Sequence, residues 1–263
     1  MGILHMPILT LTTDWGNRDH YVAAFKGELL TRIPGIVPVD VSHMVAKFNI
    51  MEASYLLKNC CSYFPKRTVH FIGLTGSEEA KSETPFVIVK SEEHYFIGHD
   101  SGIFTLLFGE TEKEIIRLPL NKNQSRKNIN SALITTISEI FDDKISSVFS
   151  REVQLFESYF ARPTFNSDSI GGSIISIDSF GNAIVNITSA LFNKIQNNRT
   201  FHIDFRKAQI SISRICTTYD DVEPGDLAIL FNQDGYLEIA INRDSAERML
   251  GLRLNDQVRV EFV

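Results

Sequence analysis

The residues best placed for chemistry lie in the segment TTDWGNRDHYVAAFKGELL, residues 12–30. Asp14 directly follows a run typical of a buried strand, and Asp19 directly precedes a helical pattern. Ligands of open α/β sheets sit beyond the carboxyl ends of the strands. Asp14 is therefore placed to accept both hydroxyls of a ribose, and Asp19 to meet an ammonium group. The structural alternatives are an Asx-turn at Asp14 and a helix N-cap at Asp19.

Two segments of the second half carry further candidates. In IDSFGNAIVNI, residues 177–187, a tight turn with Asp178, Phe180 and Asn182 follows a strand pattern. In NQDGYLEIAINRDSAERMLGL, residues 232–252, a hairpin turn, an alternating strand and a short amphipathic helix follow one another. Taken alone, both segments are more typical of structure than of chemistry.

Strands and helices alternate through the first half of the chain. Strand patterns cover residues 8–13, 36–42, 68–73, 86–91 and 94–99, and helical patterns cover residues 20–33, 50–63 and 130–142. Such alternation predicts a mixed or mostly parallel sheet with helices on both faces. We therefore expect an α/β N-terminal domain over residues 1–165.

Closely spaced strand patterns, separated by turn residues, fill the second half. They cover residues 173–179, 183–188, 200–205, 210–213, 227–232, 235–242 and 258–263. This spacing is typical of a small antiparallel barrel or sandwich, and we expect a C-terminal antiparallel β-barrel domain over residues 170–263. Turn and linker residues concentrate between Pro163 and Gly172, where the two patterns meet.

The composition argues against several classes of partner. The net charge is −6 and there is no basic face with interleaved aromatic residues, so we expect no nucleic-acid partner. No apolar run approaches the roughly 18 residues that span a bilayer, and the first residues are not typical of a secretory signal, so we expect no membrane partner. The three cysteines form neither a disulfide framework nor a metal-binding knuckle, which favours a cytoplasmic protein without a metal site.

The candidate segments, together with two others, resemble one family. The blocks are TTDWGNRDHYVAAFKG, DVSHMVAKFNIMEASYLL, HYFIGHDSG, IDSFGNAIVNI and GYLEIAINRDSA. They are similar to successive blocks of the S-adenosylmethionine hydroxide adenosyltransferases, also called adenosine-forming S-adenosylmethionine hydrolases, a family that includes the fluorinases and chlorinases. The resemblance implies a homotrimer, with a small-molecule nucleoside ligand between the N-terminal domain of one subunit and the C-terminal domain of its neighbour. It implies no cofactor, since S-adenosylmethionine is the substrate or ligand.

The resemblance also implies roles for individual residues of the first half. Asp14 stands at the acceptor of the ribose diol. Asp19, together with Asp178 of the second half, stands at a partner of the methionine ammonium group. Phe48 stands where an aromatic side chain packs on the nucleoside. Three carboxylates suit a ligand that carries both a sulfonium and an ammonium group.

Further positions of the second half belong to the implied ligand site. Asn182 resembles the asparagine that reads adenine, and Phe180 lines the same turn. Gln233 replaces a family serine, and Arg243 replaces a small residue. Arg243 is either a side chain that reaches into the adenine pocket or an exposed surface arginine.

The residues that activate water in the hydrolases differ here. The resemblance places an Asp and an Arg in the loop after the third strand, which is GLTGSEEAKSETP (73–85) in this chain. Thr75 stands at the Asp and Ser82 at the Arg. The family histidine has no counterpart, because no histidine lies between His99 and His202. Both catalytic positions are thus substituted, and the water-activating set is predicted to be lost. Halogenases have an aromatic residue at the position of Thr75, so their activity is not indicated either.

Substitute bases exist elsewhere in the family blocks. Glu78, Glu79 and Lys81 lie in the altered loop, and His43 and His99 lie near strand ends. The alternative is a solvated charged loop and two structural histidines.

Three functions remain open on the sequence. The first is hydrolysis of S-adenosylmethionine to adenosine and methionine, weakened or absent because the water-activating set is lost. The second is a non-catalytic module that binds S-adenosylmethionine or a nucleoside. The third is an enzyme that acts on another adenosyl substrate. Detection of adenosine after incubation with S-adenosylmethionine separates the first function from the second.

Overall fold

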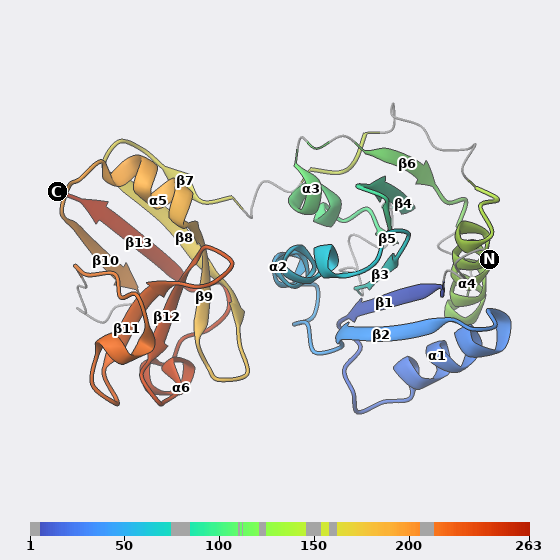
Figure 1. Ribbon diagram of the computed structural model, residues 1–263, viewed down its shortest axis with the longest axis horizontal. Coiled ribbons are helices and arrows are strands. Elements are labelled where there is room, and N and C mark those ends of the chain that lie inside the picture. The colour runs from blue at the N-terminus through green and yellow to red at the C-terminus, as the bar shows by residue number, and fades with distance from the viewer. Residues whose placement is uncertain are drawn as a thin grey trace. The chain divides into compact units, whose positions relative to one another are not determined.

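The computed structural model describes residues 6–74, 85–109, 111, 113–120, 125–145, 154–157, 162–205 and 213–263. The chain divides into two compact units, Met1–Ser158 and Tyr159–Val263 (Figure 1). Each unit has its own hydrophobic core, and each is described by itself.

The N-terminal unit is built on a six-stranded sheet with the strand order β2-β1-β3-β5-β4-β6. Strands β2, β1, β3 and β5 run parallel, and β4 runs antiparallel to both β5 and β6. The predicted mixed sheet is therefore confirmed. Its strands are β1 (Ile8–Thr13), β2 (Val37–Ser42), β3 (Val69–Gly73), β4 (Phe86–Ser91), β5 (His94–His99) and β6 (Glu114–Arg117). Its helices are α1 (Tyr21–Arg32), α2 (Ile50–Cys60), the 3-10 helix Cys61–Tyr63, α3 (Ile103–Phe108) and α4 (Arg126–Phe141).

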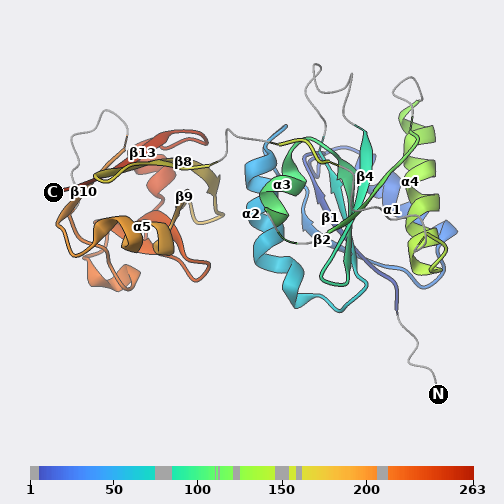
Figure 2. The same ribbon diagram turned by 90° about the horizontal axis from the view of Figure 1, so that it is seen from above.

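Helices cover both faces of this sheet, as Figure 2 shows. On one face, Leu9 and Leu11 of β1 pack with Phe25 of α1 and with α4. On the other face, α2 and α3 pack on the sheet through residues such as Leu57 and Phe104. Successive side chains of a strand point to opposite faces, so strands β3, β4 and β5 contribute to both cores. This burial holds the carboxyl ends of the parallel strands in fixed positions.

The interpretation of Asp19 as the N-cap of α1 is wrong. The helix spans Tyr21–Arg32, its N-cap is His20, and no side chain caps it. An N-cap side chain accepts from the second or third amide of the helix. Asp19 lies one position too early for that geometry, and it is exposed.

The C-terminal unit is a curled, seven-stranded antiparallel sheet with the path β10-β13-β8-β9-β12-β11 and β7 paired to β8. Its strands are β7 (Thr164–Phe165), β8 (Ser169–Ile177), β9 (Ala183–Thr188), β10 (Phe201–Phe205), β11 (Leu227–Phe231), β12 (Tyr236–Ile241) and β13 (Gln257–Phe262). Its helices are α5 (Ser189–Gln196), the 3-10 helix Tyr219–Asp221, labelled η3, and α6 (Ala246–Leu250). Over the ranges that the structure covers, no ladder joins β10 to β11, so the predicted barrel is confirmed only as a curled antiparallel sheet. The predicted strand at 210–213 lies largely outside the described residues.

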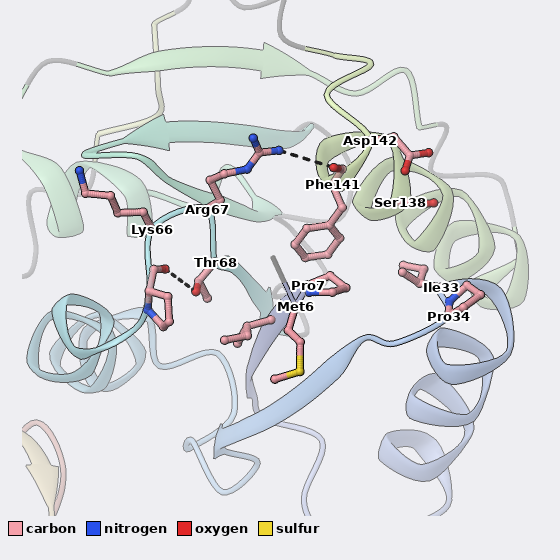
Figure 3. Close-up of a pocket in the computed structure, with 12 residues that line it drawn as sticks. Met6, Pro7, Ile33, Pro34, Lys66, Arg67, Thr68, Ser138, Phe141 and Asp142 are labelled. Atoms are coloured by element: carbon pink, nitrogen blue, oxygen red, sulfur yellow. Dashed lines mark hydrogen bonds between the residues drawn. The ribbon is translucent and has the colours of Figure 1, made fainter. Parts of the chain in front are cut away.

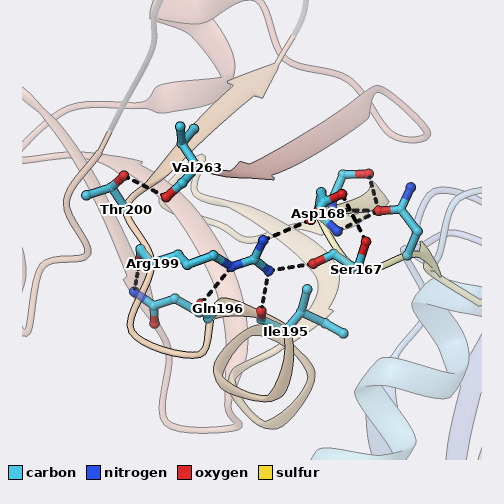
Figure 4. A network of polar contacts seen from close by, with 9 residues as sticks. Ser167, Asp168, Ile195, Gln196, Arg199, Thr200 and Val263 are labelled. Carbon is cyan, nitrogen blue, oxygen red and sulfur yellow. Dashed lines mark hydrogen bonds and ion pairs between the residues drawn. The ribbon is translucent and has the colours of Figure 1, made fainter.

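A polar network around Arg199 joins the ends of three elements of this unit: β8, α5 and β13 (Figure 4). The guanidinium of Arg199 donates to Asp168 Oδ1 at 2.9 Å, to the carbonyl of Ser167 and to carbonyls in the last turn of α5. Beside it, Thr200 and Val263 exchange hydrogen bonds. The network fixes the start of β8, the end of α5 and the end of β13, and it contains none of the candidate site residues.

Candidate functional site

In the N-terminal unit, Asp14 and Phe48 lie together at the carboxyl ends of β1 and β2. Asp14 follows β1 directly and is only 4% exposed. The amide of Phe48 donates to Asp14 Oδ2 at 3.2 Å, so the loop after β2 folds back over the end of β1. Phe48 has φ +66°, a conformation that costs energy for a bulky residue, and its side chain is half exposed. A buried, oriented carboxylate thus lies beside an exposed aromatic ring.

Local contacts hold the loop that carries Phe48. Asn49 caps α2 by accepting from the amides of Met51 and Glu52. Glu52 accepts from the amide of Ala46 at 2.8 Å. Burial raises the pKa of Glu52, and the hydrogen bond from Ala46 only partly offsets this. The sequence FNIME therefore encodes the loop conformation through an N-cap and a carboxyl group in the first turn of the helix.

In the C-terminal unit, Asp178 organises the turn between β8 and β9. Its Oδ1 accepts from the amides of Phe180 and Asn182, both at 2.9 Å, and its Oδ2 accepts from Asn182 Nδ2 at 3.0 Å. Gly181 has φ +86°, and a Cβ there would lie 2.1 Å from Ser245 Oγ. Only glycine allows the turn to pack this closely on the start of α6.

This turn forms one wall of a hollow of about 800 Å³ within the C-terminal unit. The hollow is lined by all four site residues predicted for this half of the chain: Asp178, Phe180, Asn182 and Arg243. Phe180 is 77% exposed at its rim, whereas Asn182 is 7% exposed. Arg243 is exposed and has φ +61°. Residues more than 60 positions apart in the sequence are therefore brought to one concave surface.

The sequence analysis did not name Tyr219, which belongs to this surface, or its buried partner Glu238. Tyr219 lines the hollow, and its hydroxyl donates to Glu238 Oε1 at 2.7 Å. Glu238 is 3% exposed, and its pKa is raised by burial and by the negative charge of Asp178. The available signal was a charged residue inside the otherwise apolar strand LEIAI, since a buried carboxyl group needs a partner.

Asp100 is a second buried carboxyl group that the sequence analysis did not single out. It follows β5, is 2% exposed, and accepts from the amide of Phe156 through both oxygens at 3.1 Å. Burial raises its pKa. Since β5 runs parallel to β1, Asp100 and Asp14 belong to the same edge of the sheet.

Of the remaining predicted residues, the structure describes only the two histidines. Thr75, Ser82 and the substitute bases Glu78, Glu79 and Lys81 lie outside the described residues. The ring of His99 lies 3.7 Å, centroid to centroid, from that of Phe86. His43 is buried between β1 and β2.

A separate hollow of about 270 Å³ lies at the opposite edge of the N-terminal sheet, around the amino ends of β1 and β3 (Figure 3). Its two cations are engaged: Arg67 with Asp143 at 2.7 Å and Lys66 with Glu93 at 2.9 Å. No predicted site residue lines it. We therefore do not regard it as the functional site.

The part of the chain that the structure describes contains neither a membrane-spanning helix nor a metal-binding cluster. No helix there is long and apolar enough to cross a membrane. Within the same ranges, no group of three or more His, Cys, Asp or Glu side chains is arranged to hold a metal ion.

The fold and site define a class of two-unit proteins, in which an α/β unit presents a buried carboxylate at its strand ends and a curled β unit presents a polar hollow. Comparison with known proteins gives the family. Residues 9–141 match the model of the SAM hydroxide adenosyltransferase N-terminal domain, and residues 172–259 match that of the C-terminal domain, where SAM is S-adenosylmethionine. The chain belongs to the SAM hydroxide adenosyltransferase family.

Individual relatives agree with this assignment. The chain is 27% identical to a protein of Methanocaldococcus jannaschii named (R)-S-adenosyl-L-methionine hydrolase, over 98% of this chain and 97% of that protein. It is 22% identical to a Thermus thermophilus protein of the same name, over 94% and 97%. A fluorinase of an Actinoplanes species is 33% identical over only 24% of this chain and 21% of its own. An uncharacterized conserved protein of Thermotoga maritima has the same fold, with a TM-score of 0.79 and 23% identity over 96% of this chain and 99% of that one.

Proposed function

We propose that this protein binds S-adenosylmethionine and hydrolyses it slowly to adenosine and methionine. The observation that carries the proposal is the hollow of the C-terminal unit, which gathers Asp178, Phe180, Asn182 and Arg243 on one surface. Full-length relatives named as hydrolases of this compound support the choice of ligand.

The nucleoside contacts follow from the two halves of the site. Asp14, oriented by the amide of Phe48, accepts the ribose hydroxyls, and the exposed ring of Phe48 packs on the nucleoside. Asn182 uses its Nδ2 to bind Asp178, so its Oδ1 is the atom that accepts from the adenine amino group. Phe180 covers the same turn, and Arg243 borders the hollow.

Asp19 and Asp178 supply negative charge for the methionine ammonium group. The amides of its own turn use three of the acceptor sites of Asp178, while an ionised carboxylate offers about four. The residual acceptor site and the full charge are available to a cation.

The reaction is a displacement at the ribose 5′-carbon. The water oxygen forms a bond to this carbon, the carbon–sulfur bond breaks, and its electron pair stays on sulfur as methionine leaves. Methionine is a neutral thioether and needs no proton, so no cofactor or general acid is required, and the water gives up its proton to the solvent. Side-chain chemistry therefore concerns the incoming water. Thr75 and Ser82, which the family resemblance places at the water-activating positions, are neutral and take no proton from it, so we propose slow hydrolysis.

Replacement of Asp178 by Asn tests the ligand assignment. An Asn side chain keeps one oxygen for the two backbone amides of the turn, but it removes the charge and the acceptor for Asn182 Nδ2. We expect affinity for S-adenosylmethionine to fall about tenfold or more, because a charge-assisted contact contributes about 1.5–3 kcal/mol. Affinity for adenosine, which has no ammonium group, should fall less, because adenosine is affected only through the lost contact between positions 178 and 182. Calorimetric titration with both ligands measures the difference.

Asp220→Asn is the matched control, since Asp220 is an exposed carboxylate on the same hollow without an assigned contact. It should alter neither affinity by more than about twofold. Equal losses for both ligands in Asp178→Asn would show that Asp178 only shapes the turn.

We also propose a homotrimer. Asp14 and Phe48 belong to the N-terminal unit, and Asp178 and Asn182 belong to the C-terminal unit. The family resemblance implies that a ligand contacts these two sets on neighbouring subunits. Light scattering should give three times the 29.7 kDa chain mass. A stable monomer at micromolar concentration would contradict this arrangement.

A further inference from the structure

His43 joins the carboxyl ends of β1 and β2 through its side chain. Its Nδ1 lies 2.8 Å from Thr13 Oγ1, and its Nε2 lies 3.0 Å from Asp40 Oδ1, an electrostatic contact rather than an aligned hydrogen bond. The His43 residue is 5% exposed, and Thr13 is fully buried. Neither contact belongs to the ligand site described above, but Thr13 directly precedes Asp14 in the chain.

The charge of Asp40 fixes where the imidazole proton lies. Burial acts to raise the pKa of Asp40, but contacts with Lys26 and His43 outweigh it and hold this pKa below its usual value. The ionised carboxylate faces Nε2, so Nε2 carries the proton. In the neutral ring Nδ1 then accepts from the Thr13 hydroxyl. With the proton on Nε2 facing Asp40 and the lone pair of Nδ1 directed at Thr13, His43 has no lone pair available as a base for water.

These contacts bracket Asp14 in the sequence. On one side, the Thr13 hydroxyl is held by His43 and accepts a long hydrogen bond, 3.4 Å, from the amide of Trp15. On the other side, the amide of Gly16 donates to the carbonyl of His43 at 2.7 Å. The backbone of Asp14 is therefore tied to His43 before and after the carboxylate.

We propose that His43 is a positioning residue that holds Asp14 at the angle needed to accept both ribose hydroxyls. The inference rests on the proposed function, because the ribose contact of Asp14 is part of that proposal. We call the contacts of His43 with Thr13 and Gly16 the His43 tether. A bidentate contact depends on the direction of the carboxylate, and a displacement of about 1 Å at such a site can cost as much as 10²-fold. His43 acts through Asp14 and does not itself touch the ligand.

The same sheet offers a matched comparison. Thr10 Oγ1 lies 2.8 Å from His70 Nδ1, a second buried Thr–His pair between neighbouring strands. Thr10 lies on β1 three positions before Thr13, and His70 lies on β3. The two pairs have the same chemistry and distance, but only the Thr13 pair adjoins Asp14.

The test compares Thr13→Val with Thr10→Val. Both remove a buried hydroxyl at nearly constant volume, and both should lower the urea midpoint of unfolding. Thr13→Val should weaken adenosine binding about tenfold or more, whereas Thr10→Val should change it by less than about twofold. Calorimetric titration with adenosine, in buffer without urea, measures the affinity of each variant. Equal affinities in the two variants would overturn the proposal.

Two variants at position 43 check that the side-chain contact is responsible. His43→Leu should reproduce the loss of affinity. His43→Asn should recover affinity to within about threefold, because the Asn Oδ1 occupies the place of Nδ1 and accepts from Thr13. Equal binding by the Leu and Asn variants would also overturn the proposal, even if one threonine variant fails to fold.

A double-mutant cycle with Asp14→Ala separates this proposal from the proposed function. If His43 acts through Asp14, the variant with both His43→Leu and Asp14→Ala binds no more weakly than Asp14→Ala alone. Additive losses would overturn the positioning role and leave the function intact. No effect of Asp14→Ala by itself would overturn the ribose contact and the positioning role together.

Discussion

Replacing Thr75 with Asp and Ser82 with Arg together is expected to raise the rate of adenosine formation from S-adenosylmethionine by about 10² or more. General base assistance typically contributes about 10²–10⁴ in rate. Free water is a very weak acid, so it needs a base or a positively charged neighbour to become a nucleophile at neutral pH. The two substitutions supply one of each. The initial rate of adenosine release, measured by chromatography, gives the effect.

The matched control carries Asn at position 75 and Gln at position 82. These amides have nearly the size of the charged groups but cannot take a proton from water or carry a charge. The control should stay within about threefold of the natural sequence. If the charged and neutral pairs give the same rate, these positions do not activate water, and Glu78, Glu79 and His99 become the next residues to replace.

Asp14→Ala is expected to weaken adenosine binding at least about tenfold. The variant removes the acceptor of both ribose hydroxyls, and each charge-assisted hydrogen bond contributes about 1.5–3 kcal/mol. Asp14 is 4% exposed and already oriented by the amide of Phe48. Ordering this side chain on ligand binding therefore costs little free energy. Calorimetric titration with adenosine measures the loss.

Asp14→Asn is the companion variant, because it keeps the shape and one acceptor and should lose less affinity than the alanine variant. Asp142→Ala, an exposed carboxylate after α4, controls for the change in net charge. Unchanged affinity in a folded Asp14→Ala protein would contradict the assignment of the nucleoside contact.

The helices and strands could be predicted from hydrophobic periodicity. The helix cap and the pairing of the edge strands could not, because they depend on contacts that periodicity does not indicate. Strand β1 and helix α2 begin where the pattern predicted, because each combines an unambiguous apolar period with a clear boundary residue. The cap of α1 was misjudged, since Asp19 is a favourable N-cap by type but the helix starts after His20. Closure of the barrel was inferred from strand spacing alone, which does not specify which edge strands pair.

The candidate site could be predicted only as far as local turns encode it. The turn IDSFGN specifies its own shape through Asp178 and Gly181, so the turn could be predicted from the sequence, whereas the ligand roles of its residues came only from the family resemblance. The hydrogen bond between Tyr219 and Glu238 joins segments 19 residues apart, and no local pattern indicates it.

The tether of His43 was hidden for the same reason. Thr13 and His43 are 30 residues apart and meet only because β1 and β2 pair in parallel. The sequence pointed to His43 as a candidate base, whereas in the fold its Nδ1 meets the Thr13 hydroxyl and its Nε2 faces the Asp40 carboxylate. The chemistry of a histidine depends on its partners, which only the fold supplies.

The rate of S-adenosylmethionine hydrolysis by the natural sequence is the most direct test of the proposed function. The protein is incubated with S-adenosylmethionine beside the Thermus thermophilus hydrolase that it resembles, and adenosine and methionine are followed by chromatography. We predict equal amounts of the two products, formed at a rate about 10² or more below that of the relative, because the proposed function places the neutral residues Thr75 and Ser82 at the water-activating positions. A rate equal to that of the relative would contradict the proposed loss of water activation. Complete recovery of S-adenosylmethionine would contradict hydrolysis and indicate a binding module instead.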